Sequence, residues 1–160
     1  MADIDVDVRA VDPQHVATLT RSAPSIPEVG PVVGPIFPEV SAALDRAGLL
    51  PGSYGPAVAE YLVAQDGSVD VKAGFVVPDT IDAVAGAEIR TLGAVEAAVT
   101  VHHGDMSTIS DTWNALMTWI SANGYEYAGN GREVYWSPPD LPQSEWVTDI
   151  VQPVRRAASV

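Results

Sequence analysis

The sequence predicts an α+β fold in which a strand-helix-strand-strand module occurs twice and the strands form an antiparallel sheet. Several segments alternate apolar and polar residues with the period of a half-buried strand. Two other segments place apolar residues on one face of a helix and are followed by a glycine. Two further strand segments follow each helix, and consecutive strands of this kind pair antiparallel. The 160 residues fit a single domain with two pseudo-symmetric halves, about 1–80 and 84–155.

The first half begins with two strand segments. Residues 3–9 (DIDVDVR) alternate perfectly between apolar and charged side chains, and a second strand is expected over 15–23. Five prolines over 24–40 predict an irregular loop that leads into a helix over 35–47. After this helix, GPAVAEYLV and SVDVKAGFVVP are separated by AQDG, which predicts an antiparallel hairpin.

The second half repeats this order. Residues 87–105 contain strand material, and a helix is expected over 108–122. Its predicted apolar face consists of Ile109, Trp113, Leu116, Met117 and Ile120. Strands are then expected over 132–136 and 146–154, and the last residues, RRAASV, are expected to form a frayed tail.

Composition and charge exclude several classes of protein. The 8 Lys and Arg residues against 21 Asp and Glu give a net charge of −13, which repels phosphate backbones and anionic lipid, so we expect no direct nucleic-acid binding and no membrane binding. Because the chain has no cysteine, disulfides, thiolate zinc sites and iron–sulfur clusters are excluded. No cofactor is expected. The acidic N-terminal segment does not resemble a secretory signal, so we expect a cytoplasmic protein.

A candidate ligand site follows from the alternation of side chains along a strand. Glu133 and Tyr135 share one face of the strand over 132–136, whereas Trp136 points to the other. Laying the first half over the second puts Tyr61 on the same side as Glu133 and adds apolar walls from Phe75, Trp146 and Trp113. One carboxylate among aromatic rings suits an amphipathic organic cation, because ring faces attract cations. The alternative is that Glu133 is a solvated residue on an outer face and that Trp113 belongs to the core.

Two adjacent histidines, His102 and His103, invite a metal or catalytic interpretation. Neighbouring residues on a strand face opposite sides, so the two imidazoles cannot easily bind one ion, and no metal site is predicted.

The chain resembles the GyrI-like small-molecule-binding family, the effector-binding domain of multidrug-sensing transcription regulators. The similar features are a strand ending in HHGD, a helix of the form TWNALMTWI, the stretch GREVYWSPPD and the closing WVTDIVQPV. The resemblance implies a curved eight-stranded antiparallel sheet with two main helices and a central ligand cleft. It also implies a pocket glutamate at the position of Glu133, in a member without an attached DNA-binding domain.

Three functions remain open at this point. The first is binding of an amphipathic small molecule, cationic or aromatic, for drug sensing or sequestration. The second, implied by the resemblance, is hydrolysis of cyclopropane-bearing electrophiles, in which Glu133 acts as a general base and Tyr61 or Tyr135 donates a hydrogen bond. The third is an interaction with a protein partner, as in acidic relatives that act on DNA gyrase.

Overall fold

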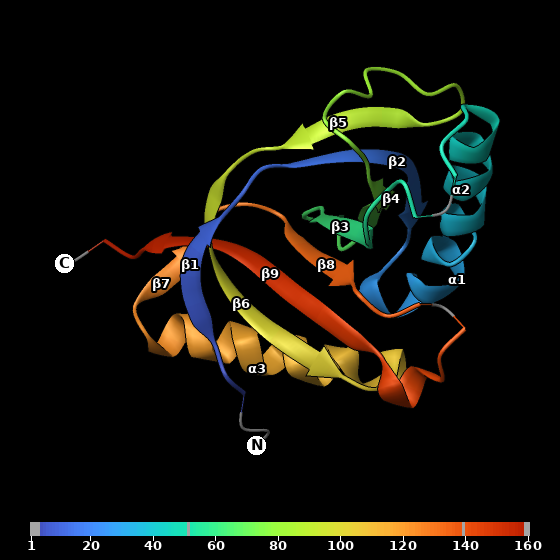
Figure 1. The fold of residues 1–160 in the computed structure, drawn as a ribbon. Helices are drawn as coiled ribbons and strands as arrows, with labels where there is room; N and C mark the ends of the chain where they lie inside the picture. The colour runs from blue at the N-terminus through green and yellow to red at the C-terminus, as the bar shows by residue number, and fades with distance from the viewer. Residues whose placement is uncertain (1–3, 51, 139, 159–160) are drawn as a thin grey trace. The chain divides into compact units, whose positions relative to one another are not determined.

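The structure is a computed structural model that describes residues 4–50, 52–138 and 140–158. The chain divides into unit 1, formed by Met1–Asp12 and Ala94–Val160, and unit 2, formed by Pro13–Gly93. Each unit combines antiparallel strands with one main helix, which confirms the predicted α+β class (Figure 1). The described residues contain nine strands, one more than the resemblance implies.

Unit 2 is a four-stranded antiparallel arrangement whose helices lie between its first and second strands in the sequence. Its strands lie in the order β3, β4, β2, β5, and the main helix α2 packs against β4 and β2. In chain order the elements are β2 (Gln14–Ala23), η1 (Ile26–Glu28), α1 (Gly30–Val33), α2 (Ile36–Arg46), β3 (Ala57–Val63), β4 (Val69–Val76) and β5 (Glu88–Leu92).

The helix, the second strand and the hairpin predicted for the first half are confirmed by α2, β2 and the β3–β4 pair. The prediction of an irregular loop over 24–40 is wrong, because this stretch contains the short helices η1 and α1 before α2. Pro27 and Pro31 lie in the first turns of these helices, where the fixed φ angle of proline suits a helix and its missing N–H is not needed.

Unit 1 places its strands in the order β1, β6, β9, β8, with β7 paired to the far end of β9. Its helix α3 packs against β6, β7 and η2. In chain order the elements are β1 (Asp7–Val11), β6 (Val95–His103), η2 (Met106–Thr108), α3 (Ile109–Ala122), β7 (Tyr125–Tyr127), β8 (Gly131–Tyr135), η3 (Gln143–Glu145) and β9 (Val147–Arg156).

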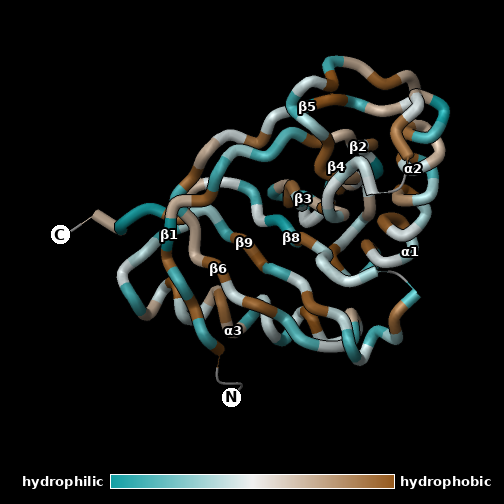
Figure 2. The backbone as a smooth tube through the Cα atoms, in the orientation of Figure 1, coloured by the Kyte–Doolittle hydropathy of each residue, from teal (hydrophilic) through white to brown (hydrophobic). Residues whose placement is uncertain are grey.

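The core of unit 1 lies between α3 and one face of its strands. Leu116 and Ile120 of α3 are fully buried and form one cluster with Ala98 of β6 and with Ile150 and Val154 of β9. Hydrophobic and hydrophilic residues are interleaved along α3 (Figure 2), as expected for a helix that buries one face. This cluster defines the helix-facing side of the strands.

The first strand begins later than the alternation predicts. β1 spans Asp7–Val11 and pairs with β6, whereas Ile4 and Val6 lie outside any strand and pack against the α3 cluster. These two side chains are partly buried, and the backbone carbonyl between them, that of Asp5, accepts a hydrogen bond from the hydroxyl of Thr100. Asp3, the first residue of the predicted strand, lies outside the described residues.

The prediction of a frayed C-terminal tail is wrong at its start. Arg155 and Arg156 continue β9 and pair with β7, a short strand that the sequence did not indicate. Arg155 forms an ion pair with Glu126, and the guanidinium of Arg156 lies 5.0 Å from the centre of the Tyr125 ring. These contacts stabilise a strand that is mostly exposed.

None of the helices in the described part of the chain has both the length and the apolar character that a membrane span requires.

Candidate functional site

The carboxylate of Glu133 is the buried acid at the centre of the candidate site. Glu133 lies on β8 and is only 5% exposed. The indole Nε1–H of Trp113 donates to its Oε2 at 2.7 Å, and the hydroxyl of Tyr135 donates to its Oε1 at 2.5 Å. Each carboxylate oxygen therefore accepts a hydrogen bond from an aromatic side chain. The solvated alternative for Glu133 is wrong, because the helix-facing side of β8 is covered.

Strand alternation and helix packing create this arrangement. Gly131, Glu133 and Tyr135 occupy alternate positions of β8, and Glu133 pairs with the core residue Ile150 of β9. Trp113 belongs to the partly buried side chains that α3 packs against the same core. A Cβ atom at Gly131 would lie 2.7 Å from Cη2 of Trp113, so the absent side chain leaves the space that the indole occupies.

Two of the predicted site residues lie in unit 2. Tyr61 pairs with Val71 in the β3–β4 hairpin. Phe75 contacts two other rings, with a centroid distance of 6.0 Å to Phe37 of α2 and 5.1 Å to Tyr54. Phe75 is thus part of a three-ring cluster beside α2, and neither Phe37 nor Tyr54 was among the residues predicted for the site.

Trp146 lies just before β9 and fixes the connection between β8 and β9. Its indole N–H donates to the carbonyl oxygen of Leu141 at 2.9 Å, and its backbone N–H donates to the carbonyl of Gln143. Trp136, on the opposite face of the strand from Tyr135, is 55% exposed and donates its indole N–H to Asp149.

The two adjacent histidines of β6 point to opposite sides, as predicted. His102 is buried and contacts the segment that enters α3, whereas His103 is exposed. Among the residues that the structure describes, no group of three or more His, Asp or Glu side chains could hold a metal ion.

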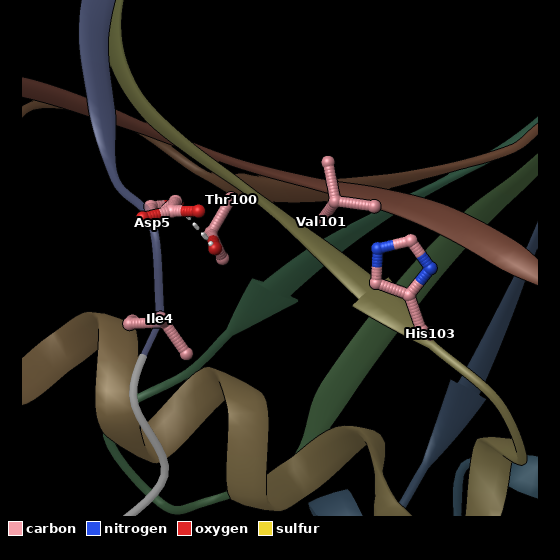
Figure 3. A pocket seen from close by; sticks show the side chains of 5 residues that line it. All are labelled: Ile4, Asp5, Thr100, Val101 and His103. Carbon is pink, nitrogen blue, oxygen red and sulfur yellow. Dashed lines mark hydrogen bonds between the residues drawn. The ribbon is translucent and has the colours of Figure 1, made fainter.

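A hollow in unit 1 does not have Glu133 among its lining residues. It has a volume of about 260 Å³ and is lined by Ile4, Asp5, Thr100, Val101 and His103 (Figure 3). The hydroxyl of Thr100 donates to the backbone carbonyl of Asp5 at 2.8 Å, which fixes one wall of the hollow. None of these residues was predicted as a ligand contact.

Sequence reasoning treated Trp113 as an apolar wall and missed its role as a hydrogen-bond donor. A signal for this contact exists in the sequence. Gly131 stands two positions before Glu133, and a glycine inside a strand often marks the close approach of a large group. The helix pattern places Trp113 toward the strands, so the two observations together could have indicated an indole over Gly131.

The family model described as the GyrI-like small molecule binding domain matches residues 4–155. The chain belongs to this GyrI-like family. A comparison with curated proteins finds no match.

Solved structures with the same fold support the assignment of this GyrI-like chain. The C-terminal domain of EcmrR is 19% identical with a TM-score of 0.71, and the match covers 96% of this chain and 99% of that one. The structure of SAV2435 bound to tetraphenylphosphonium is 12% identical with a TM-score of 0.67, covering 96% and 94%. A hydrolase from Listeria innocua is 10% identical with a TM-score of 0.61, covering 94% and 91%. At these identities the similarity establishes the fold of the GyrI-like chain.

The geometry of Glu133 in this GyrI-like domain permits two kinds of chemistry. A buried carboxylate that accepts hydrogen bonds from two aromatic side chains is a group that an organic cation can pair with. The same carboxylate could also act as a general base, with the neighbouring tyrosine hydroxyl as a hydrogen-bond donor.

Proposed function

We propose that this GyrI-like chain binds amphipathic, cationic or aromatic small molecules and serves to sense or sequester drugs and xenobiotics. The observation that carries the proposal is the carboxylate of Glu133, which is 5% exposed and held by the side chains of Trp113 and Tyr135. Burying a carboxylate is costly, and a ligand cation would offset that cost by ion pairing. The similar protein SAV2435 has been solved with tetraphenylphosphonium, an organic cation surrounded by four aromatic rings.

The aromatic residues around the acid would add tolerance for different ligands. A ring face attracts a nearby cation by about 0.5 to 2 kcal/mol, and its contact with apolar groups does not depend on their detailed shape. Trp113 and Tyr135 would be the nearest of these rings to a bound cation, since their side chains donate hydrogen bonds to the carboxylate of Glu133. Tyr61, Phe75 and Trp146 stay predicted ligand contacts of the same proposal.

The experiment compares a lipophilic cation with a neutral compound of similar shape. Tetraphenylphosphonium and triphenylphosphine oxide are titrated into the protein while tryptophan fluorescence is followed. We expect the cation to bind at least about tenfold more tightly than the neutral compound, which corresponds to about 1.4 kcal/mol. The variant Glu133→Gln should lose this preference and keep the affinity for triphenylphosphine oxide.

Glu96→Gln is a matched control, because Glu96 is an exposed carboxylate on β6 of the same unit. This substitution makes the same change from Glu to Gln. It should behave as the wild type. Equal affinities for the two compounds, or an unchanged preference in Glu133→Gln, would contradict the proposal.

A second candidate function is hydrolysis of cyclopropane-bearing electrophiles. The observation that favours it is the hydrogen bond from the hydroxyl of Tyr135 to Oε1 of Glu133, and a hydrolase is among the proteins that share the fold. Glu133 would remove a proton from water as the water oxygen bonds to a carbon of a cyclopropane that is conjugated with a carbonyl group. The electron pair of the broken ring carbon–carbon bond then moves to the carbonyl oxygen of the electrophile, which takes up a proton. Tyr135, or Tyr61, would donate a hydrogen bond to the oxygen that develops charge.

Incubation with a cyclopropane-bearing alkylating compound, followed by mass spectrometry, tests this function. Ring opening faster than in buffer is expected, with a loss of about 10²-fold in Glu133→Gln and a smaller loss in Tyr135→Phe. A rate equal to that of buffer, or full activity in Glu133→Gln, argues against an enzyme.

A further inference from the structure

A buried histidine connects β6 to the segment that enters α3. His102 is 4% exposed, and both of its ring nitrogens are within hydrogen-bond distance of this segment. Nδ1 lies 2.7 Å from the hydroxyl oxygen of Thr112, and Nε2 lies 2.8 Å from the backbone carbonyl oxygen of Asp105. One imidazole therefore contacts both the turn before the helix and the first turn of the helix itself.

The carbonyl partner fixes the direction of one hydrogen bond. A carbonyl oxygen can only accept, so Nε2 of His102 carries the hydrogen and donates to Asp105. In the neutral imidazole, Nδ1 then accepts the hydrogen bond that the hydroxyl of Thr112 donates. One side chain therefore satisfies partners in two different segments.

The start of α3 lacks the usual side-chain cap. Helices usually begin with a side chain that accepts a hydrogen bond from a free backbone N–H group, but Thr108, the N-cap of α3, makes no such bond. Leu116 and Ile120, the fully buried residues of α3, lie in its second half. Ile109 and Trp113 in the first half are only partly buried against this core, and apolar packing has little directional preference, so polar contacts add the directional restraint on the first turns.

Thr112 immediately precedes Trp113, the donor to Glu133. The first turn of α3 is thus tied to β6 through His102 and Thr112, and to β8 through Trp113 and Glu133. β6 and β8 lie on either side of β9. A change in the contact between His102 and Thr112 would alter the rotation of α3, and this rotation would move the indole N–H of Trp113 relative to the carboxylate of Glu133.

We propose that His102 is a positioning residue for the acid of the candidate site: through Thr112 it sets the rotation of α3 that aims the indole N–H of Trp113 at Glu133. The consequence for ligand affinity rests on the proposed function. The positioning itself does not, because the state of the indole N–H can be measured without ligand.

The test follows the indole resonances of the four tryptophans by ¹H–¹⁵N NMR on the full-length protein, with the resonance of Trp113 identified from Trp113→Phe. Thr112→Val keeps the shape of the side chain and removes only the hydroxyl. We expect the Trp113 resonance to move in Thr112→Val and in His102→Leu, with the Trp119 resonance unchanged. The affinity for tetraphenylphosphonium should fall about tenfold, the effect of one hydrogen bond.

His102→Gln should restore the wild-type resonance and affinity, because its amide can donate to Asp105 and accept from Thr112. A role of His102 that did not depend on these two hydrogen bonds would not be rescued by Gln. His103→Leu is the matched control, since His103 is the exposed neighbour on the other face, and it should leave the Trp113 resonance in place.

The outcomes separate the two proposals. A Trp113 resonance that stays in place in both Thr112→Val and His102→Leu overturns the positioning role, whatever the ligand data show. A resonance that moves as expected while the wild-type protein fails to bind tetraphenylphosphonium supports the positioning role and contradicts the proposed function alone.

Discussion

The close approach between β8 and α3 gives the sharpest prediction about stability. In Gly131→Ala the new Cβ atom would lie 2.7 Å from Cη2 and 3.2 Å from Cζ3 of Trp113, and 3.0 Å from Oε1 of Gln152. Contacts this short force a shift, and the nearest atoms belong to a rigid indole packed on the core. The indole must therefore move away from β8.

The magnitude combines two opposing effects. Overpacking of this kind costs about 1 to 3 kcal/mol, whereas replacing glycine by alanine recovers about 0.4 to 1 kcal/mol by restricting the unfolded chain. The midpoints of these two ranges give a net loss of unfolding free energy of about 1 kcal/mol. If the movement also breaks the hydrogen bond from Trp113 to Glu133, the loss rises further, since a bond to a charged group is worth about 1.5 to 3 kcal/mol.

A double-mutant cycle followed by urea unfolding and far-UV circular dichroism measures the effect. Trp113→Phe removes the outer ring atoms that meet the new methyl group, so adding Gly131→Ala to that background should cost close to nothing. Gly30→Ala is the control, because nothing lies within 4 Å of its added Cβ atom. The reasoning is refuted if Gly131→Ala is as stable as the wild type, or if its cost is the same with and without the indole.

Three further predictions concern single side chains. Thr148→Val should raise the unfolding free energy by about 1 kcal/mol, because the hydroxyl of Thr148 is fully buried and has no hydrogen-bond partner among the described residues; a lower value in urea unfolding would contradict this. Gly74→Ala should cost about 3 kcal/mol or more by the same measurement, since its Cβ would lie 1.8 Å from the backbone oxygen of Ala17; a loss below about 1 kcal/mol would be inconsistent with this contact. The hydroxyl and backbone N–H of Ser68 hold the pKa of Asp66 below 3.8, so the stabilisation by Asp66 is complete above that unfolded value and is lost as the pH falls through the lower folded pKa. Asp66→Ala should accordingly lower the thermal midpoint more at about pH 6 than at about pH 2.5, and an equal change at both would count against it.

Local patterns were enough to predict the helices and most strands. The apolar face of the helix over 108–122 coincides with the side chains that α3 packs on its core, and the period of two along β8 places Glu133 and Tyr135 on one face. These features depend on neighbours in the sequence, and their period is fixed by backbone geometry. For the same reason the prediction could separate His102 from His103.

Contacts between distant segments were not predictable from such patterns. The start of β1 at Asp7 did not follow from the perfect alternation of Ile4 and Val6, because these two side chains pack against the α3 cluster outside any strand. Whether an indole presents its ring face or its N–H group depends on its rotamer, and the rotamer is decided by packing. The sequence therefore predicted Trp113 as an apolar wall of the site and not as a hydrogen-bond donor to Glu133. The pairing of β7 with Arg155 and Arg156 likewise depends on a contact across the chain.

Unit 1 is formed by segments from both ends of the chain, and this has a consequence for folding during synthesis. Asp7 of β1 pairs with Val99 of β6, so β1 leaves the ribosome long before its partner strand exists, whereas unit 2 is continuous from Pro13 to Gly93. Throughout that interval β1 is an unpaired strand that could join other chains. Asp7 in β1 and Asp5 just before it alternate with apolar residues, and charges on an open strand oppose such association. The acidic alternation would then protect the nascent chain during the time in which unit 1 is incomplete.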